Sequence, residues 1–258
     1  MLLTDKHALI FAATGAIASQ VARTYAREGA TVWLSGRRAD TLSALAEEIR
    51  AAGGHAETQV VDATDSQAVR EYVAAVHQHA GRIDTVFNGI GGRPRDLGYP
   101  ASSNLQELED FLIPLRTLVG STFLTSRAAA HHMARQPEGG SIVTLTATLS
   151  RMTAPGMAGI SAACAAIEGL TRALAGEYGP QGIRVNCVRG SGMPETRTIQ
   201  ETVAGTIATF GTPPAMTLPP LGRPITVAET AGTAAFLASD LASGMTGQVV
   251  TVCAGAFV

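Results

Sequence analysis

Short apolar runs alternate with amphipathic helical segments along the whole chain, and this alternation constrains the fold more than any other feature. The first run, His7–Ala13, has no polar alternation, as expected for a strand that is buried on both faces. A small-residue turn follows it, and then a helical pattern that Gly29 ends. Strands that alternate with helices form right-handed βαβ units around a parallel sheet. The sequence therefore predicts an α/β protein with a Rossmann-type, doubly wound parallel sheet.

The alternation continues to the C-terminus without an interdomain linker or an internal repeat. Further strands are expected at 31–34, 57–61, 85–88, 141–145, 184–188 and 248–253, and further helices at 40–50, 66–79, 105–134, 159–178 and 226–241. Residues 190–224 interrupt the pattern and are rich in Pro, Gly and Thr. A loop this long in a compact domain is usually functional, often as a lid over a site. We therefore predict one dinucleotide-binding domain over residues 1–258, with a lid or substrate loop at about 190–224.

Composition and charge exclude several classes of protein. The 258 residues are 46% hydrophobic and 16% charged, with a net charge of −2, which is typical of a globular protein with a large core. This charge gives no basic surface for nucleic acid or an anionic membrane, and no apolar run reaches the roughly 18 residues that span a bilayer. We therefore expect a cytoplasmic protein that binds neither nucleic acid nor membrane. The three cysteines are widely spaced, so we expect buried, reduced thiols and no metal site.

The turn after the first strand resembles a phosphate-binding turn in which two glycines are replaced. Ala12, Gly15 and Ala18 occupy the three glycine positions of the frame. In parallel α/β sheets this turn can cradle a pyrophosphate at the start of the next helix. Ala18 is a mild change, whereas Ala12 replaces the glycine that permits the tight turn. Two interpretations stay open, a small-residue turn without a ligand and a cofactor cradle made of Ala12, Thr14, Gly15, Ala16 and Ile17.

The end of the second strand bears on the choice of cofactor. It reads Ser35-Gly36-Arg37-Arg38, with no carboxylate to bind a ribose 2′-hydroxyl. Paired arginines suit a 2′-phosphate. Arg37 and Arg38 are therefore either solvated surface residues or a site that favours NADP(H), with NAD(H) still possible.

Six longer segments are more specific than the glycine turn. They are AREGATVWLSGRR, VDATD at 61–65, IDTVFNGIGG, GSIVTLTA, AAIEGLTRALAGEYGPQGIRVNCV and FLASDLASGMTGQVVTVCAG. Together they resemble the short-chain dehydrogenase/reductase family over essentially the whole chain. The resemblance implies a nicotinamide cofactor and homo-dimers or homo-tetramers formed through two long helices and the C-terminal segment.

The resemblance also implies further cofactor contacts. The acidic turn would contact adenine, the segment after the fourth strand matches the family's Asn-Asn-Ala-Gly, and a threonine after the sixth strand would hold the nicotinamide carboxamide. The residues implied are Asp62, Ala63, Asn88, Gly89, Ile90 and Thr196. The Pro-Gly that usually precedes this threonine is replaced by Arg189-Gly190-Ser191.

The family's catalytic residues are an Asn, a Ser and a Tyr-x-x-x-Lys pair, and none of them is retained in this alignment. The aligned positions hold Leu118 (or Thr117 with a shift of one), Ala147, Ile160 and Cys164. No tyrosine occurs from Pro100 to Glu177, so no shift of the alignment restores the proton donor. The tyrosines beyond position 90 are Tyr99 and Tyr178, and neither lies in a motif frame.

The remaining side chains leave the catalytic residues unknown. Thr146, Thr148 and Ser161 are weak substitutes, because hydroxyls at such positions commonly bond to backbone, and Arg189 at the end of the sixth strand is a fourth weak substitute. Cys164 has no neighbouring positive charge that would create a reactive thiolate.

A positioned general acid typically contributes about 10²–10⁴-fold in rate, so carbonyl reduction at family-like rates is not expected. Hydride transfer to an electrophilic substrate, such as an iminium or an activated alkene, stays feasible through proximity. The sequence favours an NADP(H)-dependent oxidoreductase with a non-standard active site and an unknown small-molecule substrate. The alternatives are a catalytically inactive relative, acting as a cofactor-binding sensor or a structural partner, and a non-redox enzyme that uses the emptied pocket.

Overall fold

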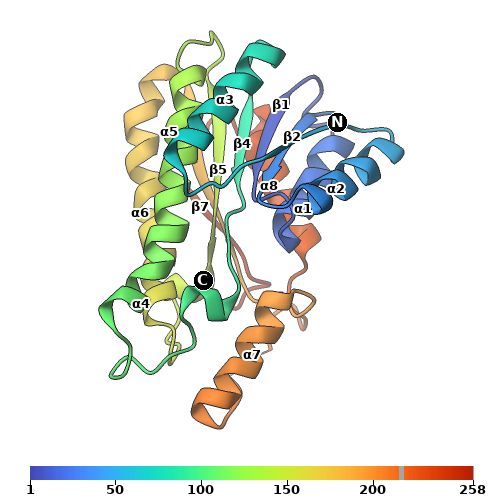
Figure 1. Ribbon diagram of the computed structural model, residues 1–258. Helices are drawn as coiled ribbons and strands as arrows, with labels where there is room; N and C mark the ends of the chain where they lie inside the picture. Colours follow the sequence, from blue (N-terminus) through green and yellow to red (C-terminus); the bar gives the residue numbers. More distant parts are fainter. Residues whose placement is uncertain (215–217, 258) are drawn as a thin grey trace.

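A parallel seven-stranded sheet with the order β3-β2-β1-β4-β5-β6-β7 runs through the computed structural model, which describes residues 1–214 and 218–257. The chain moves outward from β1 to one edge, returns to β4 beside β1, and then builds to the other edge (Figure 1). This reversal makes the sheet doubly wound, and the predicted single-domain α/β Rossmann-type fold is confirmed. The strands are β1 (His7–Phe11), β2 (Thr31–Gly36), β3 (His55–Val60), β4 (Thr85–Asn88), β5 (Gly140–Ala147), β6 (Ile183–Gly190) and β7 (Val249–Val252).

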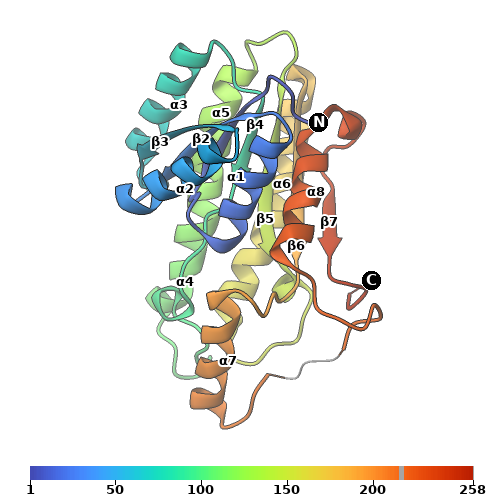
Figure 2. The same cartoon turned by 90° about the vertical axis from the view of Figure 1, so that its right-hand side faces the viewer.

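Helices cover both faces of the sheet (Figure 2). One core lies between the sheet and α1, α2 and α8, and a second lies between the sheet and α3, α5 and α6. The helices are α1 (Ala16–Arg27), α2 (Ala39–Ala51), α3 (Ser66–Ala80), α4 (Leu108–Pro114), α5 (Ser121–Met133), α6 (Ala158–Tyr178), α7 (Arg197–Phe210) and α8 (Val227–Ala238). None of the helices in the described part of the chain is long and apolar enough to cross a membrane.

Strand β1 shows why the first apolar run has no alternation. Ala8 and Ile10 belong to the core under α1, α2 and α8, whereas Leu9 and Phe11 belong to the opposite core. Successive side chains of a strand point to opposite faces, so a strand that is covered on both sides is apolar at every position.

The sequence did not predict the helix within residues 190–224. These residues were expected to form a loop, but fourteen of them form α7, with Thr196 as its N-cap. The helix is rich in Thr, Ile and Val, which have low helix propensity, so the local pattern concealed it. Residues 215–217 of the predicted loop and residue 258 at the end of the predicted domain lie outside the described residues.

The helix expected over residues 105–134 is also more complex than predicted. It begins at α4, passes through a π-helical turn at Leu115–Gly120 and continues as α5. Pro114, at the end of α4, lacks the backbone N–H that a regular helix would use there. The altered turn includes Leu118, one of the positions aligned with the catalytic residues.

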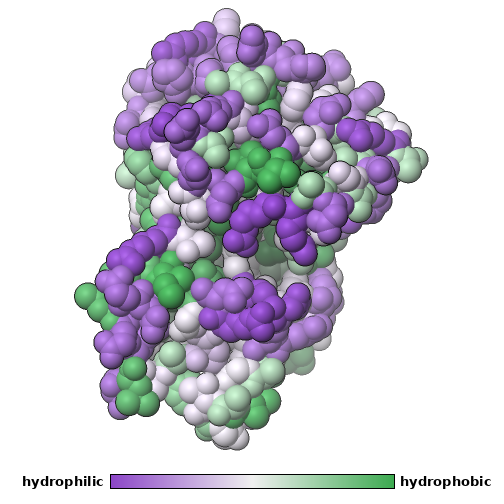
Figure 3. Space-filling model, viewed as in Figure 1, coloured by the Kyte–Doolittle hydropathy of each residue, from purple (hydrophilic) through white to green (hydrophobic). Residues whose placement is uncertain are grey.

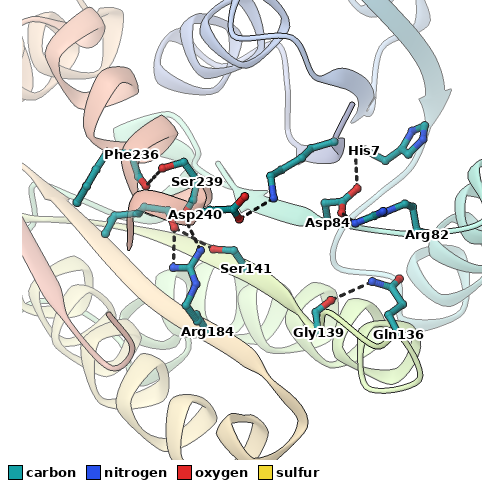
Figure 4. Close-up of polar contacts among 12 residues, drawn as sticks. His7, Arg82, Asp84, Gln136, Gly139, Ser141, Arg184, Phe236, Ser239 and Asp240 are labelled. Atoms are coloured by element: carbon teal, nitrogen blue, oxygen red, sulfur yellow. Dashed lines mark hydrogen bonds and ion pairs between the residues drawn. The ribbon is translucent and has the colours of Figure 1, made fainter. Parts of the chain in front are cut away.

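Hydrogen bonds made by polar side chains stabilise the amino ends of the strands (Figure 4). Arg184 donates hydrogen bonds to the carbonyl oxygens of Leu237 at 2.9 Å and Ser239 at 3.1 Å, and the Ser141 hydroxyl donates to Leu237 at 3.1 Å. The Asp84 carboxylate accepts from the His7 N–H at 2.8 Å. These bonds join parts of the fold to one another. In parallel α/β sheets, ligands bind at the opposite, carboxyl ends of the strands.

Candidate active site

The tight turn after β1 forms although its first residue is alanine. Ala12 has a φ of 53°, in the left-handed region that favours glycine. The Gly15 N–H donates to the Ala12 carbonyl at 3.0 Å, and the Ala13 N–H donates to Ser35 at 2.8 Å. Gly15 is the N-cap of α1 and provides no side-chain cap, so the first-turn amides of α1 have no side-chain acceptor there. This arrangement fits an anionic pyrophosphate.

Ala18, at the third glycine position of the frame, is accommodated by Gly89. A Cβ at residue 89 would lie 2.5 Å from the Ala18 Cβ and 3.1 Å from the Phe11 carbonyl oxygen. Residue 89 must therefore be glycine as long as residue 18 is alanine. The pair lets α1 pack closely against the ends of β1 and β4.

Positive and negative side chains meet beyond β2 and β3. Arg37 and Arg38 are exposed, and neither forms an ion pair within the described part of the chain. The Asp62 carboxylate accepts hydrogen bonds from the Thr64 N–H at 2.9 Å and hydroxyl at 2.7 Å. These bonds hold the pKa of Asp62 below its usual value, and the Arg37 charge adds to the effect. Two of the predicted cofactor contacts, Arg37 and Asp62, are therefore brought together, and Ala63 is half-buried beside them.

Two other predicted cofactor residues have internal side-chain partners. Buried Asn88 donates from Nδ2 to Ser126 at 2.9 Å and accepts at Oδ1 from Thr125 at 2.7 Å, which ties β4 to α5. The Thr196 hydroxyl donates to the Met193 carbonyl at 2.8 Å while it caps α7. These bonds use the side-chain polar groups of both residues within the fold.

The four positions that were expected from the sequence to align with the catalytic residues lie together in an apolar environment. Leu118, Ile160 and Cys164 belong to one buried cluster, and Ala147 packs against it. Ile90, one of the predicted cofactor contacts, also packs against this cluster. Burial raises the pKa of the Cys164 thiol, which disfavours the thiolate that a nucleophile would need.

The weak substitutes are mostly committed to other partners. The Thr146 hydroxyl donates to the Cys164 carbonyl at 3.0 Å, and the Thr148 hydroxyl lies 3.5 Å from the Met152 sulfur. Ser161 is half-buried in the first turn of α6.

Arg189, the fourth substitute, belongs to a buried polar network. Its guanidinium bonds to the Glu168 carboxylate at 3.0 Å and to the Thr251 hydroxyl at 2.7 Å, and the residue is 9% exposed. Removing one partner of such a pair leaves a buried charge. Arg189 therefore joins α6, β6 and β7.

A cavity of about 590 Å³ lies between the segment after β4 and α7. Arg93, from the segment after β4, forms a double hydrogen bond to Glu201 of α7, at 2.8 and 3.2 Å. The other lining residues are Pro94, Arg95, Gly98, Tyr99, Pro100, Ala101, Leu105, Gln106, Asp110, Ala204, Gly205, Ala208 and Thr209. Separately, Figure 3 shows a hollow near the middle of the face in view, with hydrophilic side chains above and below it.

Tyr99 is a residue of this region that the sequence motifs did not predict. It lines the cavity and also belongs to the buried cluster of Ile160 and Cys164. It lies far from the aligned catalytic positions in the sequence, so only the folded chain reveals the proximity.

Comparison with known proteins identifies the family. A family model described as Enoyl-(Acyl carrier protein) reductase matches residues 12–256. This chain therefore belongs to the short-chain dehydrogenase/reductase family of oxidoreductases.

Its relatives include dehydrogenases and reductases of similar length. An A-factor type gamma-butyrolactone 1'-reductase (1S-forming) of Streptomyces virginiae is 34% identical, with 98% of this chain and 96% of the relative covered. Gluconate 5-dehydrogenase of Gluconobacter oxydans is 32% identical, with 98% and 95% covered. A solved structure of 7 alpha-hydroxysteroid dehydrogenase complexed with NADH and 7-oxo glycochenodeoxycholic acid matches with a TM-score of 0.87 and 28% identity, and the match covers 98% of this chain and 94% of that chain.

Proposed function

We propose that this protein is an NAD(P)(H)-dependent oxidoreductase with a non-standard active site, and that it reduces an activated C=N or C=C bond. The observation that carries the proposal is the apolar cluster formed by Leu118, Ile160 and Cys164. These are positions at which the family resemblance implies proton-transfer residues. An apolar wall excludes water, and it provides neither a proton nor hydrogen bonds to an oxyanion.

The turn after β1 supports the cofactor part of the proposal. Its left-handed Ala12, the uncapped first turn of α1 and the close approach of Gly89 together fit a dinucleotide pyrophosphate. When bound, the nicotinamide cofactor supplies a hydride. The chain itself positions the substrate and keeps water away, which favours attack on an existing electrophile.

The arginines beyond β2 favour NADP(H) over NAD(H). Arg37 and Arg38 are exposed and free of ion pairs within the described residues, so their donors can reach a 2′-phosphate. The strand ends without the carboxylate that would bind a free 2′-hydroxyl. NAD(H) remains the second cofactor to be tested.

A substrate panel tests the function. We expect NADPH oxidation, followed at 340 nm, with a cyclic iminium such as N-methyl-1-pyrrolinium and with 2-cyclohexenone, and much slower oxidation with an unactivated ketone such as cyclohexanone. Calorimetry on the same preparation establishes that NADPH binds. Protein that binds NADPH but turns over neither activated substrate would contradict the proposal and favour a cofactor-binding sensor.

A further inference from the structure

One tyrosine occupies a position unlike those of the other three in the chain. The hydroxyls of Tyr25 and Tyr72 donate to the carbonyls of Ala234 and Trp33, at 3.0 and 2.9 Å, deep in the two cores. Tyr178 ends α6. Tyr99 is only 8% exposed, and it lies between the cavity and the apolar cluster at the aligned catalytic positions.

Backbone hydrogen bonds on both sides fix the segment that carries Tyr99. The Tyr99 N–H donates to the Pro94 carbonyl at 3.1 Å, and the Ala101 N–H donates to the Gly156 carbonyl at 2.9 Å. The Gln106 side chain donates to the Gly98 carbonyl at 3.0 Å. The backbone that carries the ring is therefore fixed before any ligand binds, and a fixed support is a requirement for an efficient catalytic group.

The surroundings keep the Tyr99 phenol protonated. The surroundings raise the pKa of Tyr99 to about 12, with burial as the main cause, the nearby Cys164 thiol as a further contribution, and Thr202 of α7 acting in the opposite direction. At neutral pH the group is a neutral donor. Such a phenol can give its proton to an enolate, but it is a poor general base.

We propose that Tyr99 is a catalytic residue of this oxidoreductase and donates a proton to the substrate oxygen during reduction. The assignment rests on the function proposed above and adds a proton donor that enters the site from the segment after β4. It places this donor where the cavity lining meets the cluster of Ile160 and Cys164, because Tyr99 belongs to both. No residue of the α6 motif frame takes part in this proton transfer.

The chemistry balances with one hydride and one proton. For an alkene conjugated to a carbonyl, the β-carbon receives the hydride from the reduced nicotinamide, which becomes oxidised. The π electrons move to the carbonyl oxygen, and the O–H bond of Tyr99 breaks as its proton joins the resulting enolate. After the product has left, a solvent proton returns to Tyr99 through the cavity. A quaternary iminium needs the hydride alone, because its nitrogen accepts the electron pair and becomes a neutral amine.

This difference between substrates provides the test. Tyr99→Phe keeps the ring and its packing and removes only the hydroxyl. We expect kcat with 2-cyclohexenone to fall by about 10²–10⁴-fold, the usual contribution of a general acid, and kcat with N-methyl-1-pyrrolinium to change less than about twofold. Tyr178→Phe, which also removes one phenol, should change neither rate.

Several outcomes would overturn the assignment. An equal loss with both substrates would show a structural role, and an unchanged rate with 2-cyclohexenone would show that Tyr99 gives no proton. Wild-type protein that reduces the iminium but not 2-cyclohexenone would likewise refute it while leaving the proposed function standing. If no substrate is turned over, the proposed function itself fails.

A binding measurement checks the same hydroxyl without turnover. 4-Nitrophenolate carries an oxyanion on a flat apolar ring, and its visible absorption band reports hydrogen bonding to that oxygen. We expect the wild type and Tyr178→Phe to bind it equally, and Tyr99→Phe to bind it at least about tenfold more weakly, as for the loss of one hydrogen bond to a charged group. Equal binding by Tyr99→Phe, or no binding by the wild type, would contradict the proposal.

Discussion

Single residues decide whether the turn after β1 can hold a cofactor. Ala12 adopts a backbone conformation that costs an L-residue roughly 1–2 kcal/mol, and the surrounding hydrogen bonds maintain it. Ala18 is tolerated because Gly89 lacks a side chain. The two replacements in the glycine frame are therefore accommodated in different ways: Ala12 adopts a strained backbone conformation, and Ala18 packs against a residue without a side chain.

The strain at Ala12 predicts that glycine would stabilise the protein. Ala12→Gly should raise the free energy of unfolding by about 0.5–1 kcal/mol, because relief of the left-handed strain exceeds the added entropy of the unfolded chain. Denaturant unfolding measures the difference. The neighbouring Ala13→Gly, at a buried position outside the left-handed region, should lower stability instead. Destabilisation by Ala12→Gly would show that the turn is not strained.

The charge at Arg37 predicts cofactor preference. Arg37→Ala should weaken NADPH binding by roughly 10–100-fold, the range for a hydrogen bond to a charged group, and leave NADH binding nearly unchanged. Calorimetric titration with both cofactors separates the two effects. Arg70→Ala, which removes an exposed arginine of α3, is the matched control. An equal effect on NADPH and NADH would place Arg37 away from the 2′-phosphate.

At the scale of elements, the sequence predicted the sheet better than the surroundings of the cavity. Strands such as β1 are apolar on both faces, and that signal is local. Helix α7 was missed because its Thr-, Ile- and Val-rich sequence is stabilised by the Thr196 cap and by contacts made in three dimensions. For the same reason no role in the site could be assigned to Tyr99 from the sequence alone. Nothing in the local sequence shows that Tyr99 packs in one cluster with Ile160 and Cys164.

The contact between Arg93 and Glu201 predicts how α7 responds to pH. The hydrogen bond from Arg93, with a second from Arg197, holds the pKa of Glu201 below its ordinary value of 4.5. A lowered carboxyl pKa stabilises the folded state above about 4.5, and the contribution is lost as pH falls through the folded-state pKa. Glu201→Gln should therefore lower Tm at pH 7, and the difference from the wild type should vanish at acid pH.

Thermal unfolding across a pH series measures this effect. Glu109→Gln is the control, because Glu109 pairs with Arg116 on a more exposed surface, where ion pairs contribute little. If the Tm difference between Glu201→Gln and the wild type stays the same below the pKa of Glu201, the charge of this carboxylate does not stabilise the contact between α7 and the segment after β4.

For the whole molecule, the family resemblance predicts a dimer or tetramer through the two long helices and the C-terminal segment. Helix α5 carries the exposed Phe123, and the edge strand β7 is mostly apolar and only half-buried. We expect light scattering after size-exclusion chromatography to give a mass of two or four chains. Phe123→Glu should lower this mass by placing a charge in an apolar interface. A monomeric wild type would contradict the prediction.

The central claim is that this site transfers a hydride to an electrophilic carbon without the family's usual proton donor. The most direct measurement uses NADPH deuterated at the transferring position, with N-methyl-1-pyrrolinium as the acceptor and mass spectrometry of the amine product. We expect one deuterium in each product molecule and a rate nearly independent of pH from about 6 to 8, because no proton is needed. Protein that binds the deuterated cofactor but forms no deuterated amine would contradict it.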